Sequence, residues 1–102
     1  MARFDEQIES EFDEELELEE PKLYKVMLLN DDYTSMDFVI MVLMEVFHQS
    51  AQKATEIMYR VHEEGSGLCG VYTYEIAETK VAQVHTLAKE HQFPLRATVE
   101  EE

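Results

Sequence analysis

An abrupt change of composition at Pro21 limits how much of this chain can fold. Residues 1–20 contain ten Asp and Glu residues and one basic residue, Arg3. A segment this rich in like charge buries too little apolar surface to offset the entropy lost on ordering. We therefore expect a flexible acidic N-terminal extension over residues 1–21 and one folded domain over residues 22–102.

Four apolar residues of the extension recur at every fourth position, and a helix would place them on one face. The extension could serve only to keep the protein in solution, or this stripe could dock on a partner. The sequence leaves both interpretations open. The stripe consists of Phe4, Ile8, Phe12 and Leu16.

The charge balance restricts the possible partners. The chain has 8 Lys and Arg residues against 23 Asp and Glu residues, a net charge of −15. Binding nucleic acid or an anionic membrane surface requires clustered Lys and Arg, so neither is expected as a partner. A partner that offers a positive group fits this charge better.

Other global features indicate a cytoplasmic protein. The longest apolar run, residues 38–44, is far shorter than the ~20 residues that cross a bilayer. The acidic start of the chain lacks the basic and then apolar pattern of a signal peptide. Cys69 is the single cysteine, which excludes a disulfide framework and fits a reducing compartment. We expect its side chain to be a small buried apolar group.

Apolar periodicity beyond Pro21 predicts six elements in the order β-α-α-β-α-β. This order predicts an α+β fold, in which three helices cover one face of a small antiparallel sheet of about three strands. The third strand follows Pro94, which favours a position at the sheet edge. The predicted strands are 23–29, 68–72 and 95–100, and the predicted helices are 36–48, 51–64 and 74–91.

Caps and buried stripes support the three helices. Thr34 or Ser35 is expected to cap the first helix, Ser50 the second and Thr73 the third. Gly65 is expected to end the second helix. The predicted inward stripe of the second helix is Ala54, Ile57, Met58 and Val61, and that of the third is Ala77, Val81, Val84 and Ala88.

The candidate chemistry is sparse. The sequence has no Gly-rich phosphate loop, no nucleophile elbow and no paired His at metal spacing on one helix. Asn30, Asp31 and Asp32 follow the first strand, where they could end it as turn residues or receive a cation. With His62, the two aspartates could instead bind a divalent metal in a small hydrolase. No residue is left for the role of nucleophile or general base, so we expect neither catalysis, nor a metal, nor a cofactor.

Three segments carry a resemblance to a known family: "LYKVMLLNDDYTSMDFVIMVL", "MYRVHEEGSGLCGVYTYEIAETKV" and "HQFPLRATVEE". They contain NDDYT-x-M, VH-x-x-G-x-x-x-x-G and AETK in this order. The chain thereby resembles the ClpS family over residues 22–101. The resemblance implies a protease adaptor that binds N-degrons, which are the destabilising N-terminal residues Leu, Phe, Tyr or Trp of substrate proteins. It implies delivery of these substrates to a Clp AAA+ unfoldase and its protease.

The resemblance also implies roles for individual residues. Asn30, Asp31 and His62 would hold the α-ammonium group of the substrate. A face of the third helix would dock on the N-terminal domain of a ClpA- or ClpC-type unfoldase, and the acidic extension would be required for delivery. The implied side-chain pocket consists of Asp32, Thr34, Met36, Val39, Met58, Val61 and Leu95, and the implied docking face of Glu75, Glu78, Thr79 and Lys80.

Physical chemistry supports the implied ammonium site. An α-ammonium offers three N–H donors and a full charge, for which a carboxylate, an amide oxygen and a neutral imidazole are suitable acceptors. A free amino acid would fit the same site as the ligand of a regulatory domain. Its α-carboxylate would face Asp31 and Asp32 with no arginine to receive it, so we expect peptides to bind better.

The sequence departs from the family pattern in two ways. Ser35 stands where relatives often have proline, which predicts a slightly more flexible loop. Met41 and Met44 stand where polar residues are expected, so the first helix is apolar nearly all round. Such a surface is typical of self-association or of a further contact, and the sequence does not distinguish the two.

Overall fold

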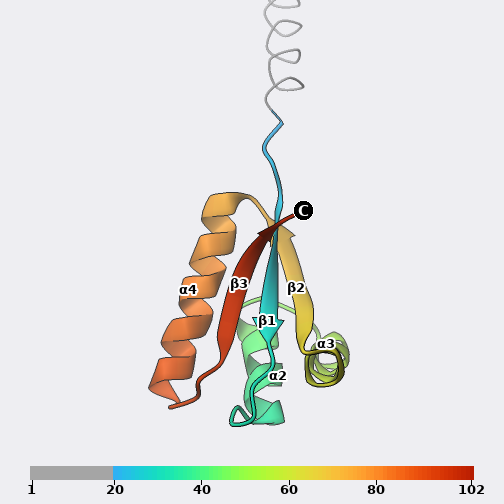
Figure 1. The fold of residues 1–102 in the computed structure, drawn as a ribbon, viewed down its shortest axis with the longest axis vertical. Helices are drawn as coiled ribbons and strands as arrows, with labels where there is room; N and C mark the ends of the chain where they lie inside the picture. The colour runs from blue at the N-terminus through green and yellow to red at the C-terminus, as the bar shows by residue number, and fades with distance from the viewer. Residues whose placement is uncertain (1–19) are drawn as a thin grey trace, which may run out of the picture.

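The computed structural model describes residues 20–102, which form a three-stranded antiparallel sheet and three helices (Figure 1). The predicted α+β fold and its β-α-α-β-α-β order are confirmed. Most of the predicted acidic extension, including its apolar stripe, lies outside the described residues. The strands are β1 (Tyr24–Leu29), β2 (Ser66–Tyr72) and β3 (Arg96–Glu101), and the helices are α2 (Met36–Glu45), α3 (Ala51–Glu64) and α4 (Tyr74–Glu90).

The first strand is the centre of the sheet, whose order is β2-β1-β3. Tyr24 at the start of β1 lies opposite Tyr72 of β2 and Glu101 of β3, and both pairings are antiparallel. The register between β1 and β2 shifts at Val26 and Met27. The edge position predicted for the strand after Pro94 is confirmed.

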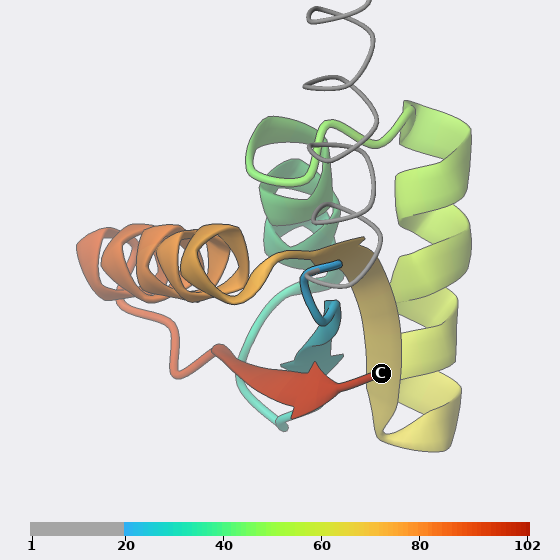
Figure 2. The same cartoon turned by 90° about the horizontal axis from the view of Figure 1, so that it is seen from above.

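One face of the sheet is buried under the helices. Val26 and Leu28 of β1 are fully buried, as the alternation of the strand predicts. In both views α2 lies between the other two helices, and α4 packs against β3 while α3 packs against β2 (Figures 1 and 2). The predicted inward stripes are buried, except that Val81 is half-buried. No helix within residues 20–102 is long and apolar enough to span a membrane.

Side-chain caps fix where the first two helices begin. The Phe38 N–H donates to Ser35 Oγ over 3.1 Å, and the Lys53 N–H donates to Ser50 Oγ over 3.1 Å. Ser35 is therefore the cap of α2, and the position that departs from the family pattern has a structural role. Thr73 occupies the N-cap of α4, but its side chain makes no capping hydrogen bond.

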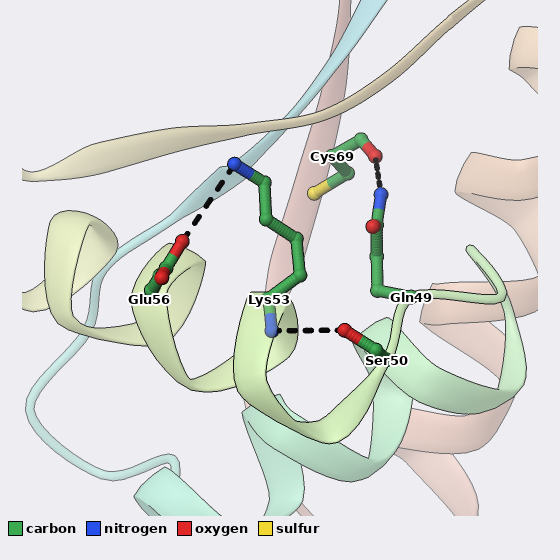
Figure 3. Close-up of polar contacts among 5 residues, drawn as sticks. All are labelled: Gln49, Ser50, Lys53, Glu56 and Cys69. Atoms are coloured by element: carbon green, nitrogen blue, oxygen red, sulfur yellow. Dashed lines mark hydrogen bonds and ion pairs between the residues drawn. The ribbon is translucent and has the colours of Figure 1, made fainter.

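The start of α3 is tied to β2 by a side chain that precedes its cap. Gln49 Nε2 donates to the backbone carbonyl of Cys69 over 3.0 Å (Figure 3). On the next turn, Lys53 Nζ lies 3.8 Å from a carboxylate oxygen of Glu56. This pair is exposed and contributes little to stability, whereas the bond from Gln49 connects two elements.

The predicted helix 36–48 is too long. The helix α2 ends at Glu45, and His48 then adopts a positive φ of 55°. This reverses the chain, so that the Gln49 N–H donates to the Leu43 carbonyl over 3.1 Å. The helical spacing of apolar residues extends beyond Glu45 in the sequence because Phe47 is also buried. Phe47 lies in the turn after α2 and not in the helix.

The strand predicted to begin at residue 68 begins at Ser66. Gly65, with a φ of 91°, ends α3 in the left-handed conformation as predicted. The turn is tight enough that Ser66 already pairs with Leu29. The end of α3 and the end of β1 are therefore neighbours.

Candidate functional site

A cavity of about 420 Å³ opens where the loop after β1 meets the start of α2 and the end of α3. We call it the loop cavity. It joins residues that are about thirty positions apart in the chain. Its lining consists of Asn30, Asp31, Asp32, Tyr33, Thr34, Ser35, Met36, Val39, Met58, Val61 and His62.

The loop cavity has an apolar floor and a polar rim. Val39 of α2 and Met58 and Val61 of α3 are buried side chains of the core. Asn30 and His62 are exposed at the rim. The apolar stripes of α2 and α3 that build the core thus also supply the floor of the loop cavity.

A backbone hydrogen bond holds the loop against the end of α3. The Asn30 N–H donates to the Gly65 carbonyl over 2.9 Å. His62 lies in the last turn of the same helix, three residues before Gly65. This bond holds Asn30 close to the last turn of α3, and Asn30 and His62 both line the loop cavity.

Asp31 organises the loop through three hydrogen bonds. Its Oδ1 accepts from the Tyr33 and Thr34 N–H groups over 2.8 and 2.7 Å, and its Oδ2 accepts from Thr34 Oγ1 over 2.6 Å. Burial alone raises the pKa of Asp31, but the bonds from Thr34 and Tyr33 outweigh it and the pKa is lowered. The carboxylate is therefore ionised at neutral pH. Its stabilisation of the loop is present above the ordinary carboxyl pKa and is lost as the pH falls through the lowered value.

The structure brings together all but one of the residues expected in the ammonium site and pocket. Leu95 is buried but does not line the loop cavity. It lines a separate cavity that includes Phe93 and Pro94. Sequence reasoning missed Tyr33, which lines the loop cavity and is 80% exposed. Tyr33 could have been found from its position in the NDDYT motif, between the expected pocket residues Asp32 and Thr34.

Gly67 of β2 determines how closely the sheet approaches the wall of the loop cavity. A Cβ at this position would lie 2.7 Å from Val61 Cγ2 and 3.3 Å from the Ile57 carbonyl oxygen. The first separation is too short for any real side chain, so Val61 packs directly on the glycine backbone. The position of this cavity wall therefore depends on residue 67 being a glycine, which has no side chain.

The expected docking face lies at the start of α4. Glu75, Glu78 and Thr79 are exposed, whereas Lys80 is half-buried. Lys80 Nζ donates to the Val46 carbonyl over 2.7 Å and thereby satisfies the end of α2. Its ammonium is thus engaged within the domain.

Two large apolar side chains share this face, and the sequence reasoning did not single them out. Tyr74 and Ile76 are 50% and 49% exposed. The Tyr74 ring packs edge-on against Tyr24, with 5.1 Å between the ring centroids. A hydrogen bond to Glu78 raises the pKa of Tyr74. The start of α4 therefore combines carboxylates with accessible aromatic and aliphatic surface.

Within residues 20–102, no group of three or more His, Cys, Asp or Glu side chains is arranged to hold a metal ion. Cys69 is buried as expected, and burial raises the pKa of its thiol to about 12. A thiol with this pKa is protonated at neutral pH and a poor nucleophile.

Comparison with known proteins identifies the family. The family model described as "ATP-dependent Clp protease adaptor protein ClpS" matches residues 19–98. The chain belongs to the ClpS family. The ClpS adapter of Syntrophus aciditrophicus is 52% identical over 96 residues, which cover 88% of this chain and 90% of that protein. The ClpS adapter of Oleidesulfovibrio alaskensis is 58% identical over 87 residues, covering 85% and 84%.

A solved structure of the ClpS family shares the fold. Agrobacterium tumefaciens ClpS2 bound to L-phenylalaninamide is 49% identical and superposes with a TM-score of 0.78. The match covers 80% of this chain and 99% of the ClpS2 chain. The ClpS-family resemblance drawn from three sequence segments is thereby confirmed.

Proposed function

We propose that this protein is a Clp protease adaptor that binds N-degrons in the loop cavity. The observation that carries the proposal is the joining of a polar rim to an apolar floor in one cavity. L-Phenylalaninamide, the ligand of the related ClpS2 structure, combines a free α-ammonium with an apolar side chain, and so matches both parts. The preferred substrates begin with Leu, Phe, Tyr or Trp.

In this proposal Asn30, Asp31 and His62 form an ammonium clamp. The Asn30 amide oxygen and a neutral His62 nitrogen are acceptors at the mouth of the cavity. Asp31 supplies the negative charge, because its lowered pKa keeps it ionised. Its two oxygens already accept three bonds from the loop, so it also sets the loop conformation on which the other two acceptors depend.

Both parts of the cavity are required for useful affinity. Burying a Leu or Phe side chain contributes about 1.5–3 kcal/mol, and each charge-assisted hydrogen bond contributes about 1.5–3 kcal/mol. Ordering the bound peptide costs at least ~4 kcal/mol. A pocket without the clamp would retain almost no net affinity. Internal residues and acetylated N-termini, which cannot use the clamp, are therefore not expected to bind.

Delivery uses a different part of the molecule. We assign docking on the N-terminal domain of a ClpA- or ClpC-type unfoldase to the face formed by Glu75, Glu78, Thr79 and Lys80. Lys80 contributes mainly by holding the end of α2 against α4. The protein acts by binding, without a catalytic step of its own, and in the cytoplasm. A metal-dependent hydrolase is not favoured, because ClpS proteins are protease adaptors.

A direct test is fluorescence anisotropy with short amidated peptides that differ only in the first residue. We expect peptides that begin with Leu, Phe, Tyr or Trp to bind and those that begin with Ala, Asp or Lys to bind at least tenfold more weakly. A matched control places Leu second after Gly. Equal binding of the control would contradict recognition of the first residue.

Met36 is expected to exclude β-branched first residues. It lines the loop cavity at the first position of α2, where its thioether would meet the extra Cγ of Ile or Val. Overpacking by one methyl-sized group typically costs about 1–3 kcal/mol. Met36→Ala should therefore admit Val and Ile peptides and weaken Leu peptides modestly, as measured by anisotropy. Continued exclusion of Val and Ile by the variant would place the discrimination at another pocket residue.

Gly67→Ala is expected to narrow the loop cavity. The added Cβ would displace Val61 toward the cavity, since it would otherwise lie only 2.7 Å from Val61 Cγ2. Affinity for Trp and Phe peptides should fall about five- to tenfold more than affinity for Leu peptides, which corresponds to the lower end of the overpacking cost given above. Anisotropy measures this ratio, and thermal unfolding measures the accompanying loss of stability.

The double variant with Gly67→Ala and Val61→Ala is the matched control for this prediction. Removing the displaced methyl groups should restore the ratio of Trp to Leu affinity. An unchanged ratio in the single variant would show that β2 retreats from α3 instead of moving Val61.

A further inference from the structure

Arg96 borders a second, smaller cavity beside the ammonium clamp. This side cavity has a volume of about 120 Å³ and is lined by Leu29, Asn30, Asp31, Pro94 and Arg96. Arg96 begins β3 and lies opposite Leu29, the last residue of β1. It is therefore placed at the end of the sheet from which the loop with Asn30 and Asp31 departs. Those two residues line both cavities.

The guanidinium group of Arg96 is accessible. Leu95 and Ala97 on either side of it are buried, whereas Arg96 is exposed, in keeping with the alternation of a strand. No ion pair among residues 20–102 involves Arg96. In this part of the chain its five N–H donors are free for a ligand.

Asp31 also lines the side cavity, but within residues 20–102 it forms no ion pair with Arg96. Both carboxylate oxygens of Asp31 accept hydrogen bonds from Tyr33 and Thr34 within the loop. A guanidinium matches the two oxygens of a carboxylate in a bidentate pair. Asn30 adds amide donors at the boundary of the two cavities. The side cavity thus offers anion-binding groups directly beside a site suited to an ammonium.

We propose that Arg96 and Asn30 form a subsite for a carboxylate carried by the second or third residue of a bound peptide. This rests on the proposed function, because the peptide must first be anchored in the loop cavity. The two cavities share Asn30 and Asp31 as lining residues, so the side cavity is the adjoining space in which we place the second or third residue of the peptide. The subsite offsets the repulsion that a net charge of −15 exerts on acidic substrates.

Anisotropy with amidated peptides that begin with Leu tests the subsite. The peptides carry Asp at position two, Asp at position three, or Ala at both, and amidation removes the terminal carboxylate. Arg96→Gln should weaken one or both Asp peptides three- to fivefold, the upper part of the range for an exposed ion pair, and leave the Ala peptide within twofold. The peptide with the larger loss identifies the position that is read. Arg60→Gln, which removes an exposed arginine from α3, is the control for net charge.

Two results would overturn the subsite. One is that Arg96→Gln lowers the affinity for Asp and Ala peptides equally. The other is that Arg60→Gln lowers the affinity for the Asp peptides as much as Arg96→Gln does. Either result would mean that the arginine acts only through long-range electrostatics. Failure of the Ala peptide to bind the wild-type protein would overturn the proposed function itself, and this result is distinct from either.

Discussion

Acetylating the α-amino group of a peptide that begins with Leu or Phe should lower its affinity by about 2–3 kcal/mol, or roughly 30- to 150-fold. Acetylation removes the positive charge and two of the three N–H donors while leaving the side chain unchanged. The loss is large because the rim of the loop cavity offers Asn30, Asp31 and His62 together, and the single N–H of the acetylated terminus leaves two of these three acceptors without a donor. Isothermal titration with matched free and acetylated peptides measures it.

Variants of the clamp show whether the loss arises there. His62→Ala should weaken the free peptide strongly and the acetylated peptide little, since the bond it removes is absent from the acetylated complex. Because His62 is exposed at the end of α3, this variant should unfold at nearly the wild-type temperature. An acetylated peptide that binds as well as the free one would show that the clamp is wrongly placed.

Asp31→Ala should behave differently from His62→Ala. It removes a charged acceptor and also the three hydrogen bonds that shape the loop. We therefore expect a loss of about 2–3 kcal/mol in affinity together with a lower unfolding temperature. The two variants separate direct contact with the ammonium from positioning of the loop.

The fold could be predicted from the sequence because local signals agree with each other. The alternation around Val26 and Leu28, the caps Ser35 and Ser50, and the helix-ending Gly65 each specify the same order of elements. The prediction was wrong at the end of α2. Phe47 keeps the helical period of apolar residues although the chain has already turned, and His48 with its positive φ gave no signal.

The candidate site was predictable only in part. The NDDYT motif and His62 gave the rim, but sequence spacing could not show that the Asp31 carboxylate is occupied by the loop. The sequence analysis also expected no arginine to receive a carboxylate beside Asp31 and Asp32. Arg96 is far from Asp31 in sequence, and the pairing of β3 with β1 brings it to the adjoining cavity.

Deleting residues 1–20 should abolish or strongly slow degradation of N-degron substrates while leaving peptide affinity within twofold of the wild-type value. Within residues 20–102, every residue that lines the loop cavity lies between Asn30 and His62, so we expect binding not to require the extension. Delivery is proposed to require it. The measurement compares peptide anisotropy with the rate at which the partner unfoldase and protease degrade a fluorescent substrate that begins with Leu.

Two full-length variants distinguish what the extension contributes. Replacing residues 1–20 by a Gly and Ser segment of equal length tests whether length alone suffices. Changing Phe4, Ile8, Phe12 and Leu16 to Ser keeps the ten acidic residues and removes only the apolar stripe. If the stripe docks on the unfoldase, both variants should bind peptides normally and deliver them poorly. Normal delivery by the serine variant would assign the function to length or charge, and normal delivery by the truncated protein would leave the extension with a role in solubility alone.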